Sequence, residues 1–453
     1  MRRNVRALAV LAIVPFALAA CSSGDADGDS ASSGGDSAGT TVSYWLWDAN
    51  QLPSYQKCAD AFTTESGINV KIEQYGWDDY WSGLTNNFVA GNAPDVFTDH
   101  VSQYPQFASQ GQLLDINPLV EKDAVDLTLY QDGLADLWVD QEGSRYGLPK
   151  DWDTIAAFYN ADMATEAGLS AEQMATLEWN PTDGGTYEQA IAAMTVDANG
   201  VHGDQPGFDK SDVAVYGLGL AGSGGAFGQT EWSMYAMANG FEYADKNPWG
   251  TQWSFGSADF TDTMQWWRGL IEKGYMPALE IAQSGVSLQE NYGAGKYAMI
   301  TEGSWNTNSY MTLTGVNTEL APTPVGPTGE RASLFNGLAD SIWAGTKQPE
   351  AAWEWVKFLG SSQCQDIVAA DAIVFPAVKS SLEIAEKAFA EKGYDTSAFT
   401  VHVEDGTTHL APIADHFADM AAAMTAAGET FLSFKGETDV YVAANDEINA
   451  LFE

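Results

Sequence analysis

Aromatic side chains stand beside carboxylates and amides at several points of this 453-residue chain. A polyhydroxylated ring such as a sugar offers apolar C–H faces on which an aromatic ring can stack. It also offers a rim of hydroxyls that carboxylates and amides can bind in the plane of the ring. Residues of these types, which we take as candidate ligand contacts, are Trp47, Asp48, Asn50, Gln51, Asp99, His100, Asp151, Trp152, Asp153, Trp305, Asn336 and Asp340.

Each candidate also has a purely structural alternative. Short polar residues that follow strands often cap helices or shape turns, which is the alternative for Asp48, Asn50 and His100. A tryptophan can pack a core rather than a ligand, and Trp152 in particular can pack between two domains. Asp153 and Asp99 are the carboxylates that we favour as ligand contacts, and Trp305 and Trp47 are the aromatic ones.

Paired carboxylates in a Trp-lined cleft also suit glycoside hydrolysis, so a secreted glycoside hydrolase is one alternative function. A binding protein for a peptide or a compatible solute is another. The chain contains no HExxH motif, and a formal GxGxxG match at 217–222 runs on into a glycine-rich loop instead of a helix. We therefore expect a protein that is not an enzyme and that holds neither a cofactor nor a metal.

The charge is strongly one-sided, with 20 Lys and Arg against 62 Asp and Glu, a formal net charge of −42. Such a surface repels phosphate backbones, which argues against nucleic acid as a partner. With 45% hydrophobic residues the chain can bury a large core, and its length favours two domains. Its mean hydropathy of −0.19 is unlike that of a protein with many membrane spans.

The first twenty residues have the pattern of an export signal. Three arginines lie within 1–6, an apolar run covers 7–20, and Leu18-Ala19-Ala20-Cys21 resembles the lipobox of bacterial lipoproteins. We expect residues 1–20 to be a signal peptide and Cys21 to be lipidated. The Ser-, Gly- and Asp-rich residues 21–40 then form a flexible tether at the extracytoplasmic face of the cell membrane. Cys58 and Cys364 remain, either as a disulfide or as two buried thiols.

Strand-like and helical segments alternate along the rest of the chain. We expect strands at 41–47, 68–74 and 95–98 and helices at 54–66 and 80–90, and later helices at 187–194, 260–273, 350–359 and 364–370. This alternation predicts an α/β fold with βαβ units, in which ligands bind at the carboxyl ends of the strands.

Five segments in a fixed order carry a resemblance to a known family. They are SYWLWDANQ, FTTESGINVKIE, the pair GNAPDVFTDH and GQLLDINPLV, then RYGLPKDWDTIAAFYNADMATEAGL, and finally YGAGKYAMITEGSW followed by AAWEWVKFLGSSQCQ. In these segments the chain resembles the extracellular solute-binding proteins of ABC sugar importers, the family-1 group that includes maltodextrin-binding protein.

The resemblance implies a two-lobe periplasmic-binding-protein-like fold, in which each lobe is a β-sheet flanked by helices and a multi-crossing hinge joins them. Lobe 1 would comprise 41–149 plus 317–360, and lobe 2 would comprise 150–316 plus 361–453. It also implies an oligosaccharide ligand held between the lobes, with ABC permease transmembrane subunits as partner. At the positions of this chain, Trp305 and Asp153 match sugar-contacting residues of the family. We expect a monomer.

Overall fold

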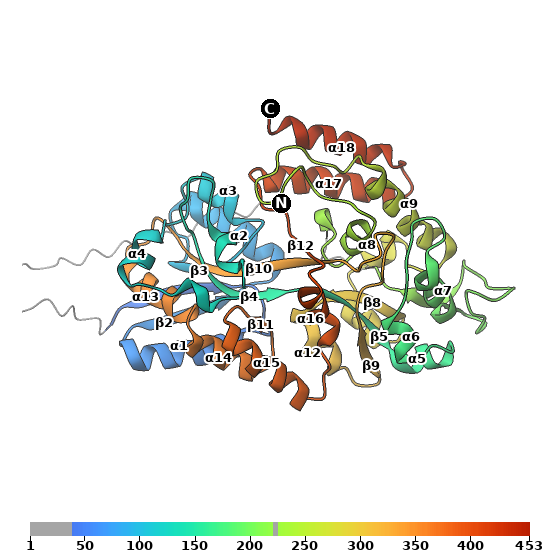
Figure 1. The fold of residues 1–453 in the computed structure, drawn as a ribbon, viewed down its shortest axis with the longest axis horizontal. Helices are drawn as coiled ribbons and strands as arrows, with labels where there is room; N and C mark the ends of the chain where they lie inside the picture. Colours follow the sequence, from blue (N-terminus) through green and yellow to red (C-terminus); the bar gives the residue numbers. More distant parts are fainter. Residues whose placement is uncertain (1–38, 221–224) are drawn as a thin grey trace, which may run out of the picture. The chain divides into compact units, whose positions relative to one another are not determined.

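Two β-sheets organise the chain, and the computed structural model describes residues 39–220 and 225–453 of it (Figure 1). The expected signal peptide, the lipidation site Cys21 and most of the expected tether lie outside the described residues. In the described part of the chain, no helix combines the length and the apolar character that a membrane span requires.

The first sheet has the strand order β11-β4-β10-β3-β1-β2, with β12 paired to β10. Strand β1 pairs in parallel with β2 and β3, whereas β10 runs antiparallel to β3 and β4. Its strands are β1 (Thr41–Leu46), β2 (Asn69–Gln74), β3 (Val96–His100), β4 (Leu148–Asp153), β10 (Ser333–Ile342), β11 (Phe375–Pro376) and β12 (Thr408–Leu410).

The second sheet has the strand order β6-β7-β8-β5-β9. Strands β7 and β8 are parallel, and β5 is antiparallel to both of its neighbours. Its strands are β5 (Ile155–Asn160), β6 (Val196–Asp197), β7 (Val213–Leu218), β8 (Tyr297–Gly303) and β9 (Thr318–Ala321).

Helices cover both sheets, which confirms the expected α/β fold (Figure 1). Those of the first half of the chain are α1 (Leu52–Ser66), α2 (Trp77–Ala90), α3 (Tyr104–Ser109), α4 (Asn117–Lys122), η1 (Leu127–Leu129), η2 (Leu134–Trp138), α5 (Ala161–Glu166), α6 (Ala171–Ala175) and α7 (Gly185–Met194). Those of the second half are η3 (Gly225–Phe227), α8 (Ser233–Ala238), α9 (Ala258–Lys273), α10 (Leu279–Ala282), α11 (Leu288–Gly293), η4 (Ser304–Asn306), α12 (Thr307–Met311), α13 (Pro349–Leu359), α14 (Ser362–Ala370), α15 (Lys379–Glu391), α16 (Ser397–Glu404), α17 (Phe417–Leu432) and α18 (Asp439–Ala450).

Helix α1 shows how local sequence sets an element. Pro53 stands in its first turn, where a missing N–H costs nothing. It ends at Gly67, whose φ of 74° is left-handed and whose N–H donates to Thr63 O at 2.9 Å. In the following strand β2, Val70 and Ile72 are partly buried, whereas Asn69 and Lys71 are exposed.

The chain passes from the first sheet to the second at a single residue. Strand β4 ends at Asp153 and β5 begins at Ile155, so that Thr154 alone joins them. Thr154 is fully buried, its hydroxyl donates to Phe399 O at 2.9 Å, and its carbonyl accepts from Ser304 N. Hydrogen bonds to Phe399 and Ser304 therefore fix the position of this crossing.

Cys58 of α1 and Cys364 of α14 form a disulfide, with their Cα atoms 5.2 Å apart. This resolves the alternative that the sequence left open. The disulfide joins residues 306 positions apart and ties the C-terminal half of the chain to the first helix. Both cysteines are fully buried among the side chains of α1, α13 and α14.

Sheet membership and the expected lobe ranges can be compared strand by strand. Strands β1 to β3 and β10 fall in the first sheet, and β5 to β8 in the second, as the ranges 41–149 plus 317–360 and 150–316 would place them. β9, however, lies in the second sheet, and β4, β11 and β12 lie in the first. The lobe boundaries themselves stay a prediction.

Candidate ligand-binding cleft

A cavity of about 790 Å³ lies among elements that belong to both sheets. From the first sheet it is lined by the ends of β1, β3, β4 and β10, and from the second by η4 after β8, together with η3 and α17. Its lining residues include Trp47, Asp48, Gln51, Trp77, Asp78, His100, Ser102, Gln103, Asp151, Trp152, Asp153, Phe227, Gln229, Trp305, Asn306, Asn336, Phe417 and Thr425.

Most of the residues singled out from the sequence meet at this cavity. Those that line it are Trp47, Asp48, Gln51, His100, Asp151, Trp152, Asp153, Trp305 and Asn336. Asn50, Asp99 and Asp340 are not part of the lining. Asn50 is exposed, and its amide donates to Ser309 Oγ at 3.2 Å.

An aromatic cluster forms one wall. The Trp47 ring lies 5.2 Å from Trp77 and from Tyr80 and 5.3 Å from Trp81, measured between ring centroids. The Trp77 ring also stands edge-on to His100, at 5.9 Å. Trp77 is 46% exposed although it is a large apolar side chain, so its ring offers free surface on which a ligand could stack.

Trp305 lies against the backbone of Gly303. A Cβ atom on Gly303 would come within 1.8 Å of the Trp305 ring, so no other residue type fits beneath this ring without moving it. Trp305 is half-buried and lines the cavity from the second-sheet side. The Gly-Ser-Trp sequence thus fixes the position of an aromatic surface.

Trp152 has a different setting from the other tryptophans. It is 2% exposed and stacked between Phe335, at 5.6 Å, and Phe375, at 4.8 Å, so both ring faces are already covered. Its indole Nε1 is buried and has no hydrogen-bond partner within the chain. Trp152 therefore cannot stack on a ring, although it can offer an edge and an N–H donor to the cavity.

Asp153 links the two sides of the cavity. Gln229, which precedes α8 in the second-sheet region, donates through Nε2 to Asp153 Oδ1 at 3.1 Å. The Asn336 amide of β10 lies 3.4 Å from Asp153 Oδ2. Burial, and then the nearby Asp151 carboxylate, raise the pKa of Asp153 well above its usual range.

His100 and Asn336 are neighbours across β3 and β10. The Asn336 amide lies 2.7 Å from His100 Nε2, and the backbone N–H of Ser102 donates to His100 Nδ1 at 3.2 Å. Burial lowers the pKa of His100 to about 4, so the ring is neutral at ordinary pH. Both side chains are thereby oriented before any ligand arrives.

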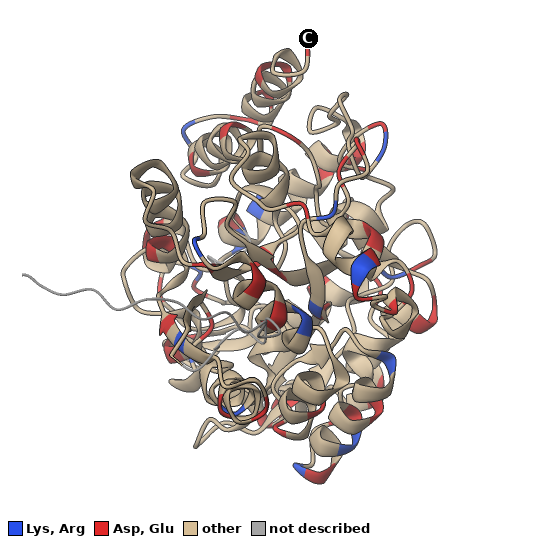
Figure 2. Cartoon of the chain, turned by 90° about the vertical axis from the view of Figure 1, so that its left-hand side faces the viewer, with Lys and Arg blue, Asp and Glu red and all other residues tan. Residues whose placement is uncertain are grey.

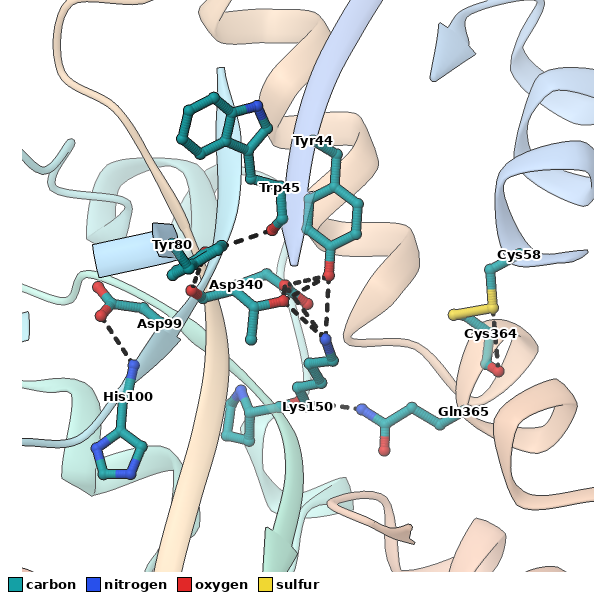
Figure 3. Close-up of polar contacts among 12 residues, drawn as sticks. Tyr44, Trp45, Cys58, Tyr80, Asp99, His100, Lys150, Asp340, Cys364 and Gln365 are labelled. Carbon is teal, nitrogen blue, oxygen red and sulfur yellow. Dashed lines mark hydrogen bonds and ion pairs between the residues drawn. A yellow bond between two sulfur atoms is a disulfide. The ribbon is translucent and has the colours of Figure 1, made fainter. Parts of the chain in front are cut away.

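Asp99 stands on the opposite face of β3 from His100 because successive side chains of a strand alternate (Figure 3). It is fully buried, its Oδ1 accepts from the His100 N–H at 2.8 Å, and burial raises its pKa to about 7. The sequence placed Asp99 among the favoured ligand contacts, whereas the structure gives it no access to the cavity.

Asp340 lies on the same sheet face as Asn336 but deeper beneath α1. Its Oδ1 accepts from Tyr44 Oη at 2.8 Å and from Thr98 Oγ1 at 3.1 Å, and Lys150 Nζ lies 4.0 Å away (Figure 3). Its side chain is thus engaged inside the sheet rather than in the cavity.

The described residues contain no group of three or more His, Cys, Asp or Glu side chains that could hold a metal ion. Asp197 uses its carboxylate inside its own loop. Its Oδ1 accepts from Asn199 N and Val201 N, and its Oδ2 accepts from Asp209 N.

A family model described as bacterial extracellular solute-binding protein matches residues 57–394. The chain belongs to this family. Among characterised relatives, this solute-binding protein is 26% identical to the maltodextrin-binding protein MdxE of Bacillus subtilis, over 86% of this chain and 85% of the relative. It is 27% identical to a galactooligosaccharide-binding protein of the same organism, over 84% of this chain and 82% of the relative.

Solved structures share the fold of this solute-binding protein. An ABC substrate-binding protein from Listeria monocytogenes, in complex with cycloalternan, superposes with a TM-score of 0.76 at 18% identity, covering 91% of this chain and 98% of that one. The fold is accordingly the two-lobe one, with each lobe a sheet flanked by helices.

Several lining residues of this solute-binding protein were missed from the sequence. Trp77 and Asp78 begin α2 in the connection that follows β2, and they repeat the Trp-Asp pair that Trp47 and Asp48 form just after β1, so the segment YGWDD carried a usable signal. Phe417 of α17 and Gln229 had none, because they reach the cavity only through packing between distant parts of the chain.

Proposed function

We propose that this protein is the substrate-binding component of an ABC importer and captures an oligosaccharide in the cavity described above. The single observation that carries this proposal is the composition of the lining. Half-exposed tryptophan rings stand on both sides of the cavity, and buried carboxylates and amides lie between them. The names of the characterised relatives support the same substrate class.

The lobes would close on the ligand, with Thr154 at one hinge crossing. A ligand shifts such an equilibrium only by its higher affinity for the closed form. Contacts made from both sheets, by Trp47 and His100 on one side and Trp305 on the other, supply that difference. We keep 41–149 plus 317–360 and 150–316 plus 361–453 as the proposed lobes.

The protein would be held at the outer face of the cell membrane through acyl chains on Cys21, with residues 22–40 as a tether. It would act as a monomer and deliver its sugar to the transmembrane subunits of the permease. Labelling of cells with a radioactive fatty acid tests the anchor, because a Cys21→Ala variant should lose the label and appear in the medium.

Substitution Trp305→Ala tests the site. It removes the stacking surface on the second-sheet side, and we expect sugar affinity to fall at least about tenfold, since an aromatic contact of this size contributes on the order of 1–3 kcal/mol. Isothermal titration calorimetry against α-glucans, galactosides and xylo-, manno- and fructo-oligosaccharides would identify the sugar and measure the loss. An affinity within threefold of that of the unmodified protein would refute the assignment.

The same purified protein tests whether it is an enzyme. We expect no product when it is incubated for a day with each oligosaccharide that it binds and the mixture is separated by chromatography. Release of shorter sugars, lost in an Asp153→Asn variant, would instead establish the glycoside hydrolase alternative.

A further inference from the structure

Carboxylates line the cavity without a matching cation. Asp48, Asp78, Asp151 and Asp153 all belong to the lining, and no Lys or Arg is found among its described residues. Residues 221–224, which precede the lining residue Gly225, read Ala-Gly-Ser-Gly and bring no positive charge either. The cavity therefore offers carboxyl groups but no cation, so an anionic ligand would find no positive partner there.

Lys150, a buried cation next to Asp151 in the chain, forms its hydrogen bonds outside the cavity lining. A bulge between β4 and β10 leaves Lys150 without a partner on β10, because Leu338 pairs with Asp151 and Ala339 with Pro149. Lys150 instead points away from the cavity lining, donating to Tyr44 Oη at 3.1 Å and Thr98 Oγ1 at 2.8 Å (Figure 3).

The groups around Lys150 balance its positive charge. Its Nζ lies 3.9 Å from the centre of the Tyr55 ring and 4.0 Å from Asp340 Oδ1. The hydroxyls of Tyr44 and Thr98 that accept from Lys150 in turn donate to Asp340, so this buried pair is balanced within itself. Lys150 is therefore not fully available as a counter-charge for the carboxyl groups that line the cavity.

Those carboxylates also act on one another. Burial raises the pKa of Asp151 to about 7, Lys150 offsets part of this, and Asp340 and Asp48 add to it. Asp151 in turn raises the pKa of Asp153. Asp151 is 2% exposed, and its Oδ2 has no hydrogen-bond partner within the chain. A cationic donor beside Asp151 and Asp153 would relieve both the repulsion and the missing bond.

We propose that the saccharide bound in this cavity carries a protonated amine, which lies against Asp151 and Asp153. This inference rests on the proposed function and names its substrate class more closely. A saccharide that bears a carboxylate or phosphate is disfavoured, because no Lys or Arg among the described lining residues would pair with its charge. The aromatic wall of Trp47 and Trp77 suits the ligand as well, because the faces of such rings attract cations.

Binding changes the protonation of the site. Below neutral pH the Asp151 carboxyl holds a proton in the empty protein, and an ammonium group placed beside it favours the ionised form. The proton is then released to the buffer, while the ammonium keeps its own. A neutral sugar has no such effect, so proton release separates the two kinds of ligand without any substitution.

The experiment compares saccharides that differ in one group. Pairs in the β-1,4 and α-1,4 series, such as cellobiose with its glucosamine counterpart, are titrated calorimetrically at pH 6 in two buffers of different ionisation enthalpy. The amine member should bind at least about tenfold tighter than the neutral one and release close to one proton, and the corresponding uronate should bind at least about tenfold more weakly.

Variants locate the effect. Asp151→Asn and Asp153→Asn should each reduce the preference for the amine towards unity, whereas Asp79→Asn, an exposed carboxylate on the same helix as Trp77 that does not line the cavity, should leave it intact. Equal affinity for both members of each pair, with equal proton release, would overturn this inference while the proposed function stands. Binding of glycine betaine or a dipeptide alone, with no saccharide bound, would overturn both.

Discussion

A residue without a side chain determines where the main aromatic surface of the cavity lies. Gly303 has a φ of −86°, which any residue can adopt, so its backbone does not demand glycine. The demand comes from the Trp305 ring, which occupies the space of a Cβ atom. A single methyl group at this position should therefore act on the ligand through the ring.

Gly303→Ala is expected to push the Trp305 ring out of place and lower sugar affinity about tenfold, close to the effect of Trp305→Ala itself. The two substitutions should not add, because both remove the same contact. Calorimetric titration of both single variants and the double variant measures this. Gly269→Ala, in α9 with no atom within 4 Å of its Cβ, is the matched control and should bind sugar normally. Additive losses would contradict the mechanism.

Asp99 gives a pH-dependent prediction. Because burial raises the pKa of Asp99 to about 7, the folded protein favours its protonated form, and the stability that this provides is complete below about pH 4 and is lost as pH rises through 7. Asp99→Asn keeps the oxygen that accepts from the His100 N–H but cannot ionise. Its Tm should exceed that of the unmodified protein by several degrees at pH 8.5 and by much less at pH 5.

Thermal unfolding followed by circular dichroism at both pH values checks this expectation, and sugar affinity should be unchanged because Asp99 does not line the cavity. A Tm difference of the same size at pH 5 and pH 8.5 would mean that ionisation of Asp99 is not its cause.

The case of Asp99 also shows where sequence reasoning on the site ends. Every residue of β3 is buried, so the apolar pattern cannot tell whether Asp99 or its neighbour His100 faces the ligand. Sequence reasoning favoured Asp99, whereas the structure places His100 at the cavity. Asp340 shares its sheet face with Asn336 but lies deeper, under α1. The local sequence predicted which residues follow the ends of strands. It could not predict how deep a residue such as Asp340 lies along its strand, or which distant helices pack against the cavity.

At the scale of elements, the sequence located the strands and helices well because their ends carry local chemical signals. Gly67 and Gly274 end α1 and α9 with left-handed φ values of 74° and 78°. The pairing of α1 with α14 carries no such signal, since it depends on contacts between segments about 300 residues apart. The disulfide between these helices therefore had to come from the structure.

Replacing both cysteines, Cys58→Ala with Cys364→Ala, should lower the free energy of unfolding by about 2–5 kcal/mol, because the crosslink closes a very long loop in the unfolded chain. Urea unfolding followed by tryptophan fluorescence measures this. Sugar affinity should remain normal, because neither cysteine lines the cavity. The single variants serve as controls and should resemble the double one. A stable double variant with weakened sugar binding would contradict the expectation.

At the scale of the whole molecule, the charge is the dominant property. Asp and Glu residues are spread over helices and loops, with few Lys and Arg among them (Figure 2). Arg145 is buried, so it does little to balance the surface. Such an excess keeps a protein soluble and separates its copies, but it also makes the folded chain repel itself.

We therefore expect added salt to raise the Tm by several degrees between low and near-physiological ionic strength, because ions screen this repulsion. Differential scanning calorimetry in NaCl and, as control, in KCl at the same concentrations checks the expectation, since screening does not depend on which monovalent cation is used. A Tm that is constant across the series would show that self-repulsion contributes little to the stability of this protein.

The junction at Thr154 has a mechanical consequence. Asp153, which lines the cavity, is separated by one residue from the start of β5 and so sits at a pivot between the two sheets. A residue at the hinge moves little when the two lobes rotate about it. Under the proposed closure, Asp153 would thus contact its ligand equally in the open and closed forms. It would hold the ligand at a fixed position, and the free energy that favours closure would come from contacts farther from the hinge.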